Sequence, residues 1–408
     1  MDQFVDQVYA GVDTHKDTHV GAVIDRLGRL LDTRSFSTSN AGYEDLRNWM
    51  NALGPVAAIG VEGTGSYGAG LMRYLRNHGE VVKEVNRPNR QMRRRHGKND
   101  AVDAEAAARA VLAEEAAGEP KSQDGIIETI RLYRLLLVTF RKERTALVNT
   151  LRNVLITGPD DLRQRLEPLA AGALLDHCAR LRPQGEVDDP SHAARATLRA
   201  LGRQIAGLDV QLKDVRHTLT DLATTANPEL MAAQGVGVDS ASILLVAVGD
   251  NQERFHTESS FAAFCGVSPI EASSGENCRH RLNRGGNRQA NNALWRIAMI
   301  RLQTDPRTKE YAARRKAQGK TPRDIIRCLK RFIAREIYRI LTDPQPIPPI
   351  DDLRPKRLAQ GLTMQVVADH FGLALTTISR TERGIKVNHD FARNYRDWLA
   401  CQHVPIAA

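Results

Sequence analysis

The sequence lacks the features of a membrane, secreted or disulfide-bonded protein. Its five cysteines are spread along 408 residues and no two form a CxxC pair, which argues against a zinc knuckle or a disulfide framework. No stretch approaches the roughly 20 consecutive apolar residues that cross a bilayer. The N-terminus carries acids where a secretory signal would carry lysines. We therefore expect a cytoplasmic protein with no membrane partner.

The chain is long and basic. A chain of 408 residues exceeds one ordinary core, so two or three domains are expected, and the 42% of hydrophobic residues suffices to fold them. The net charge is +10, with nine Lys or Arg against two acids over 73–98 and sixteen against three over 279–331. A solvated face explains a single charge run, but two one-signed blocks favour a nucleic-acid partner. The first block contains Arg93, Arg94 and Arg95.

Four acidic residues occupy positions where catalytic groups are expected. Asp13 and Glu62 each follow an apolar run, and Asp100 and Asp103 open an alanine-rich segment. Residues three apart share a helix face, so the last two can point at one ligand. Each acid alone has an ordinary explanation as a turn or first-turn residue. Carboxylates gathered in one site raise each other's pKa unless a divalent cation lies between them, so the joint pattern predicts Mg²⁺ or Mn²⁺.

Residues 1–117 alternate strand-like and helix-like segments. Apolar runs predict strands at 8–12, 20–24, 56–61 and 81–85. Helical spacing predicts helices at 42–53, 71–78 and 101–117. The early succession of strands predicts an antiparallel start to a mixed sheet. The fold class is therefore α/β with a ribonuclease H-like layout, followed by helical regions.

The middle of the chain is predicted to be helical. Residues 126–157 and 192–226 carry apolar residues at helical spacing with charges on the other face, and both segments are unusually long. A connection rich in proline and glycine, 158–190, separates them. This pattern predicts a helical hairpin or coiled coil. It can serve as a dimer seam or as a spacer between domains.

Two short motifs follow. The GVGV turn at 235–238 resembles that of a helix–hairpin–helix, whose backbone N–H groups can hold a DNA phosphate. Beyond it, Ser273 and Ser274 precede a glycine and a basic segment that enters a helix, which fits a phosphate oxyanion site. In isolation this serine loop reads as an ordinary turn. The candidate phosphate-binding arginines are Arg279, Arg281, Arg284 and Arg288.

The C-terminal part is separable. A proline-rich linker at 341–352 precedes a helix-turn-helix pattern, with helices at 364–370 and 375–383 and a turn at Gly372. The pattern resembles the Cro/C1 repressor-type module. Alternatively, a threonine at the start of the second helix serves only as its N-cap. The candidate base-contacting residues are Thr376, Thr377, Ser379 and Arg380.

Together these motifs resemble the DEDD-type insertion-sequence transposases, the family that includes the Piv DNA invertase. The resemblance covers roughly 7–340 and rests, in order, on GVDTHKDTHV, VEGTGSYG, KNDAVDAEAAARA, GVGVDSASILLVAVGD, and SSG with RGGNRQANNALW. It implies a RuvC-like DEDD domain at 1–117, a long helical region at 118–226 and a transposase domain at 227–340. The repressor-like module at 353–400 departs from the simplest family layout.

The resemblance also implies roles and partners. Asp13, Glu62, Asp100 and Asp103 would form the metal-binding tetrad, and Ser274 would be the nucleophile, with Ser273 a weaker candidate. The implied activity is metal-dependent cleavage and exchange of DNA strands at element ends and target. A structured guide RNA encoded by the element is an implied partner, and a homodimer or tetramer is expected.

Two rival functions remain open on the sequence. The first is a Holliday-junction resolvase or another ribonuclease H-like nuclease, in which the acids cut with water and Ser274 is only a turn residue. The second is a DNA-binding regulator built on the C-terminal module, with a decayed nuclease fold.

Overall fold

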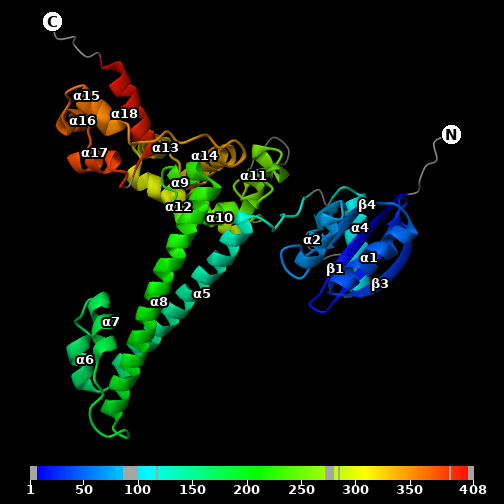
Figure 1. Cartoon of the computed structure of the whole chain (residues 1–408), viewed down its shortest axis with the longest axis horizontal. Coiled ribbons are helices and arrows are strands. Elements are labelled where there is room, and N and C mark those ends of the chain that lie inside the picture. Colours follow the sequence, from blue (N-terminus) through cyan, green and yellow to red (C-terminus); the bar gives the residue numbers. More distant parts are fainter. Residues whose placement is uncertain are drawn as a thin grey trace. The chain divides into compact units, whose positions relative to one another are not determined.

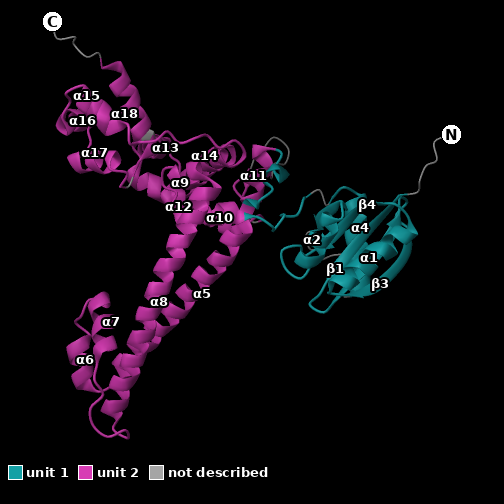
Figure 2. Ribbon diagram, viewed as in Figure 1, with its two compact units in different colours: residues 1–125, 248–256 teal, residues 126–247, 257–408 magenta. Residues whose placement is uncertain are grey.

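The computed structural model divides the chain into two compact units (Figures 1 and 2). Unit 1 comprises residues 1–125 and 248–256, and unit 2 comprises residues 126–247 and 257–408. The structure describes residues 7–85, 99–115, 118–271, 280–283, 285–385 and 387–402.

Unit 1 is built on a five-stranded mixed sheet in the order β3-β2-β1-β4-β5. β1 pairs antiparallel with β2, β2 pairs antiparallel with β3, and β1, β4 and β5 run parallel. The antiparallel start predicted from the sequence is confirmed. The strands are β1 (Val8–Thr14), β2 (Thr18–Asp25), β3 (Leu30–Ser37), β4 (Val56–Glu62) and β5 (Val82–Val85).

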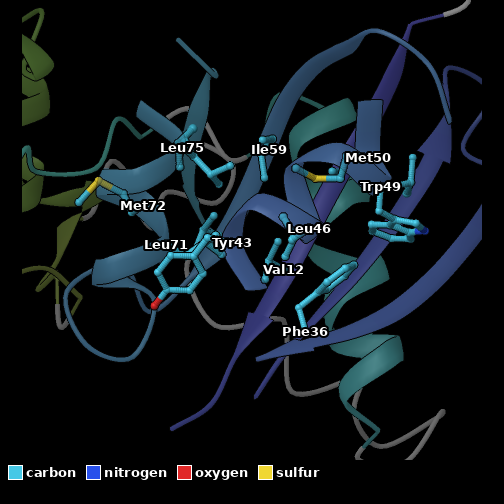
Figure 3. Close-up of a cluster of buried hydrophobic side chains, with 14 of the residues drawn as sticks. Val12, Phe36, Tyr43, Leu46, Trp49, Met50, Ile59, Leu71, Met72 and Leu75 are labelled. Atoms are coloured by element: carbon cyan, nitrogen blue, oxygen red, sulfur yellow. The ribbon is translucent and has the colours of Figure 1, made fainter. Parts of the chain in front are cut away.

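The hydrophobic core of unit 1 lies between one face of this sheet and two helices, α1 (Asn40–Leu53) and α2 (Ala69–Asn77). Figure 3 shows side chains of both helices meeting those of the strands, among them Val12, Leu46 and Leu71. Successive side chains of a strand point to opposite faces. Burial of Val12 on this face therefore directs Gly11 and Asp13 to the other face of the sheet.

That other face is covered by α4 (Asp100–Leu112), which approaches the strands through residues with small side chains. A Cβ added to Gly11 would lie 2.1 Å from the Ala104 carbonyl oxygen, and one added to Gly60 would lie 2.7 Å from the Ala107 carbonyl oxygen. The helix backbone therefore rests almost directly on β1 and β4.

The sequence-based end of this helix is wrong for the residues that the structure describes. Strong alanine propensity predicted a helix to residue 117, but α4 ends at Leu112 with Ala113 as its C-cap. Glu114 adopts a left-handed backbone conformation, with φ of 55°. A residue in that conformation cannot continue a right-handed helix.

Unit 2 contains the two long helices that the sequence predicted, α5 (Ile126–Thr157) and α8 (Pro190–Ala226), packed along each other as a hairpin. The connection between them differs from the expected loop, because it contains α6 (Asp160–Leu166) and α7 (Ala171–Arg180). Their apolar side chains pack against the facing turns of the long helices. We call residues 158–195 the tip module. Within the described part of the chain, no helix is long and apolar enough to cross a membrane.

The remaining part of unit 2 before the C-terminal segment is also mainly helical. A two-stranded antiparallel hairpin, β6 and β7, separates α11 from α12. The linker predicted from residue 341 begins later, because α14 extends to Thr342. The elements are α9 (Pro228–Ala232), α10 (Val238–Val248), α11 (Glu258–Phe264), β6 (Ile270–Glu271), β7 (His280–Arg281), α12 (Arg288–Thr304), α13 (Pro306–Ala317) and α14 (Pro322–Thr342). A short 3₁₀ turn, η1 (Gln252–Arg254), belongs to unit 1.

The C-terminal segment forms four short helices around its own core. Gly372 ends α16 in the left-handed conformation, with φ of 61°, as its place in the predicted turn requires. Ala374 is the N-cap residue of α17 and makes no side-chain capping bond, so the suggestion that Thr376 or Thr377 caps this helix is wrong. The helices are α15 (Leu353–Ala359), α16 (Met364–Phe371), α17 (Leu375–Glu382) and α18 (His389–Cys401).

The contact of α4 with β1 generates a test of the fold. We expect Gly11→Ala to destabilise the protein by about 1–3 kcal/mol, because the new methyl group would overlap the α4 backbone. Gly65→Ala is the matched control, since a Cβ there meets nothing within 4 Å. Thermal unfolding of both variants checks this, and equal melting temperatures would contradict the close approach of α4.

Candidate metal centre

Two neighbouring parallel strands bring the first pair of acids together. Val12 of β1 pairs with Val61 of β4, so Asp13 and Glu62 occupy the next step at the carboxyl ends of these strands. Gly11 and Gly60, two residues earlier, both face α4. The two-residue period of a strand therefore places Asp13 and Glu62 on the α4 face as well.

The first turn of α4 supplies the second pair of acids. Asn99 caps this helix by accepting a hydrogen bond from the Ala101 amide at 3.1 Å, so the helix begins at Asp100. Asp103 is 5% exposed, and Asp13 is 7% exposed. The structure thus brings the N-terminus of α4 to the same edge of the sheet as Asp13.

His15 completes this group, and the sequence reasoning missed it. Its Nε2 atom lies 3.2 Å from Oδ2 of Asp13 and 3.3 Å from Oδ1 of Asp100. Its position two residues after Asp13 was the available signal, because alternation directs the two side chains to one side. The strand ends are also joined by Thr14, whose hydroxyl donates to the Glu62 carbonyl at 2.8 Å.

The pKa of the Asp13 carboxyl reflects its burial and its charged neighbours. Burial raises the pKa of the Asp13 carboxyl, His15 acts to lower it, and the charges of Asp103 and Asp100 raise it further. The balance is a raised pKa, so the folded protein disfavours a charged Asp13 in the absence of a compensating cation.

The donor set fits a divalent cation. Asp13, His15 and Asp100 each offer one ligand atom, and these atoms lie within 4.8 Å of one another. Two carboxylate oxygens and an imidazole nitrogen are common ligands of divalent metals. A cation between them would also relieve the repulsion felt by Asp13. Asp103 and Glu62 stand outside this closest trio, on the same face of the sheet.

A second group of charges lines a cavity of about 580 Å³ in unit 2, beside the β6–β7 hairpin. Lys330 donates a hydrogen bond to Oδ1 of Asn291 at 2.9 Å, and burial lowers the pKa of this lysine. Arg281 lines the cavity from β7, and Arg288 is exposed at the start of α12. The lining cations are Arg281, Arg315, Lys320, Arg327, Lys330 and Arg331.

The other candidate residues are either on α17 or outside the described part. On α17, Thr376 and Arg380 are exposed, and Thr377 and Ser379 are half-buried. Seven candidates lie outside the described residues, namely Arg93, Arg94, Arg95, Ser273, Ser274, Arg279 and Arg284.

The acidic centre predicts a linked effect of substitution and metal. We expect Mn²⁺ to raise the melting temperature of the unsubstituted protein and to leave Asp13→Asn unchanged, because that variant loses a buried ligand. In chelator, Asp13→Asn should melt higher than the unsubstituted protein, since neutralising Asp13 removes repulsion. His15→Gln should weaken Mn²⁺ binding by at least roughly tenfold, because loss of a residue that only orients a ligand already costs about 10–100-fold and His15 offers a ligand atom itself.

Thermal unfolding with and without Mn²⁺ measures each effect. Asp17→Asn is the control, since Asp17 is an exposed acid near the same strand end and is not in the ligand trio. An Mn²⁺ response of Asp13→Asn equal to that of the control variant would rule out a metal site at Asp13.

Two families of known proteins match parts of this chain. Residues 10–157, which include all four acids, match a family described as Transposase and named for the DEDD transposases of IS110. Residues 227–313 match a family described as Transposase IS116/IS110/IS902.

A relative from Streptomyces coelicolor, named "Insertion element IS110 uncharacterized 43.6 kDa protein", is 30% identical over 183 residues. That alignment covers 45% of this chain and 44% of the relative, so less than half of the relative's length is matched. Two successive parts of the chain are therefore similar to transposases of the IS110 type.

Proposed function

We propose that the protein is a DNA transposase that cleaves and exchanges strands at the ends of an insertion sequence and at its target. The observation that carries this proposal is the convergence of Asp13, His15 and Asp100 inside a transposase-family match. In the proposed layout, residues 1–117 form the nuclease domain, 118–226 the helical region, 227–340 the transposase domain and 353–400 the DNA-binding module.

A ribonuclease H-like, RuvC-like identity for the first domain is supported by strand order. Three antiparallel strands are followed by two parallel ones, and the acids stand at the ends of the two adjacent parallel strands β1 and β4. Catalytic groups gather at the carboxyl ends of parallel strands in α/β folds. This arrangement supports the proposal that the acids act together at one edge of the sheet.

The acidic centre would hold Mg²⁺ or Mn²⁺ through Asp13, Asp100 and His15, with Glu62 and Asp103 on the same face. When bound, such an ion supplies charge stabilisation to a phosphoryl group. Asn99 fixes the first turn of α4 and thereby orients Asp100.

Ser274 is the proposed nucleophile. Its hydroxyl oxygen attacks the scissile phosphorus, forming a phosphoseryl bond while the bond from phosphorus to a deoxyribose oxygen breaks. The seryl proton is transferred, in net terms, to that leaving oxygen, which becomes a hydroxyl. Attack by the hydroxyl of another strand reverses the step and restores the serine, so the bond energy is conserved for strand exchange. Cations such as Arg281 and Lys330 would neutralise phosphate charge.

A denaturing-gel assay tests the nucleophile. With the element's junction DNA, its flanking transcript and Mg²⁺, we expect a covalent protein–DNA adduct that Ser274→Ala abolishes and Ser273→Ala retains. Asp13→Asn should reduce adduct formation by at least about 100-fold, because the metal-binding acids act in the same reaction.

The same assay distinguishes strand exchange from the rival hydrolytic nuclease activity. DNA cleavage that survives Ser274→Ala, with no adduct in any lane, would mean a hydrolytic nuclease in which Ser274 is a turn residue. Loss of the adduct in chelator completes the test of metal dependence.

The C-terminal helices support a further part of the proposal, sequence-specific DNA binding by a helix-turn-helix. The tight turn at Gly372 joins α16 to α17, and Thr376 and Arg380 are exposed on α17. Arg357 forms an ion pair with Glu382 at 2.7 Å, and the Tyr395 hydroxyl donates a hydrogen bond to Glu382 at 2.8 Å. These contacts fix the end of α17 in the module's core. A helix held in this way can present polar side chains to base edges.

Substitution on α17 tests that role. We expect Arg380→Ala to lose about 1–3 kcal/mol of discrimination between preferred and random DNA, because a base-edge contact disappears. Arg354→Ala is the control, since it removes an equal charge from an exposed position on α15. Binding measured on selected and scrambled DNA gives the ratio, and equal ratios for the two variants would exclude base readout by Arg380.

A guide RNA and self-association complete the proposal. The cavity cations beside the β6–β7 hairpin suit a phosphodiester ligand, and the family resemblance suggests an element-encoded RNA among such ligands. Three leucines, Leu132, Leu135 and Leu136, are exposed on α5. An exposed apolar stripe on a long helix supports a homodimer or tetramer.

A further inference from the structure

The tip module lies outside both family matches, because the first match ends at residue 157 and the second begins at residue 227. It is nevertheless a packed structure. Leu166 of α6, Leu174 and Cys178 of α7 and Leu198 of α8 are all buried in one cluster with the end of α5. Hydrophobic packing therefore holds α6 and α7 in place.

Between these helices is a cavity of about 690 Å³, within the range of roughly 300–1,000 Å³ typical of ligand sites. Basic side chains approach it from three helices and from the segment after α7. Asp176 is the one acid that lines it. The basic residues are Arg165, His177, Arg180, Arg182 and Arg195.

The charge of this cavity does not follow from the composition of the segment. Residues 158–195 contain five arginines and seven acids, so the segment as a whole is acidic. Four of those five arginines nevertheless line the cavity, with one of the seven acids. Folding has separated the charges and concentrated the positive ones in a concave site.

Most of the arginines that line the cavity are also available to bind a ligand. Among the residues that the structure describes, Arg165 and Arg182 have no ion-pair or hydrogen-bond partner, and both are exposed. Arg180 donates only to a backbone carbonyl of its own helix, that of Asp176, at 3.0 Å. Arg195 pairs with Asp161 at 3.1 Å. Guanidinium groups without partners in a concave site suit an anion that can accept several N–H bonds.

We propose that this cavity binds the phosphodiester backbone of a nucleic acid. This inference rests on the function proposed above, because a DNA transposase acts on nucleic acid and the ligand class is taken from that activity. The site stands at the end of α5, whose 32 residues span about 48 Å. A contact there would hold a nucleic acid well away from the start of that helix.

Binding of the full-length protein to labelled 30-mers tests the proposal, with single-stranded RNA, duplex RNA and duplex DNA as separate probes in chelator over a salt series. We expect the double variant Arg165→Ala, Arg182→Ala to bind at least one probe roughly tenfold more weakly than the unsubstituted protein. Its plot of log affinity against log salt should lose about 0.7–0.9 in slope for each arginine removed. The probe that responds identifies whether RNA or DNA occupies the cavity.

The matched control is Arg152→Ala, Arg163→Ala. These two arginines are exposed on α5 and α6 near the same end of the hairpin, and neither lines the cavity. Their loss removes the same charge, so the control should keep near-normal affinity and slope.

Equal binding by the two double variants, on all probes, would overturn the proposal. Thermal unfolding verifies that both variants fold, and the pair Arg165→Gln, Arg182→Gln replaces the alanine variant if its melting temperature falls. Because the assay contains no metal and scores no strand cleavage, it remains decisive even if the adduct test on Ser274 fails.

Discussion

The acidic centre depends on one close contact, the approach of α4 to the backbone of β1 at Gly11. An ordinary side chain at this position would hold the helix away by at least the size of a methyl group, since the added Cβ would lie 2.1 Å from a carbonyl oxygen. Because Asp100 and Asp103 occupy the first turn of this helix, their distance from Asp13 is set by that contact. In unit 1, the small residues that allow α4 to approach the sheet therefore also determine where the acids of α4 lie.

At a pH where its carboxyl is charged, Asp13 opposes folding when no cation is present. Burial and the neighbouring carboxylates raise the pKa of Asp13, and His15 offsets part of that effect. The rest of the unit must supply the compensating stability, and the apolar cluster on the opposite face of the sheet is suited to do so. A crowded acidic cluster on one face of the sheet thus coexists with a well-packed core on the other.

The arginines of unit 2 divide by what they contact. Arg141 and Arg216 both bind Asp239 in the first turn of α10; burial acts to raise the pKa of Asp239, but these two arginines together lower it. Arg357 is buried against Glu382. Such paired arginines join helices, and in the Arg357–Glu382 pair the removal of one partner would leave a buried charge. Arg165 and Arg182 of the tip module, by contrast, have no ion-pair or hydrogen-bond partner among the described residues, so the proposed ligand role explains them better.

Most local elements and the four candidate acids could be predicted from the sequence alone. The periodicity of α5 and α8 spans many turns, so both helices could be predicted nearly to their ends, and strand ends marked Asp13 and Glu62. An edge strand with one buried residue, β3, gave little pattern, and short helices such as α6 were concealed among prolines and glycines. The contact of His15 with Asp100 beside Asp13 could not be predicted in this way, because it requires a helix far along the chain to pack on Gly11.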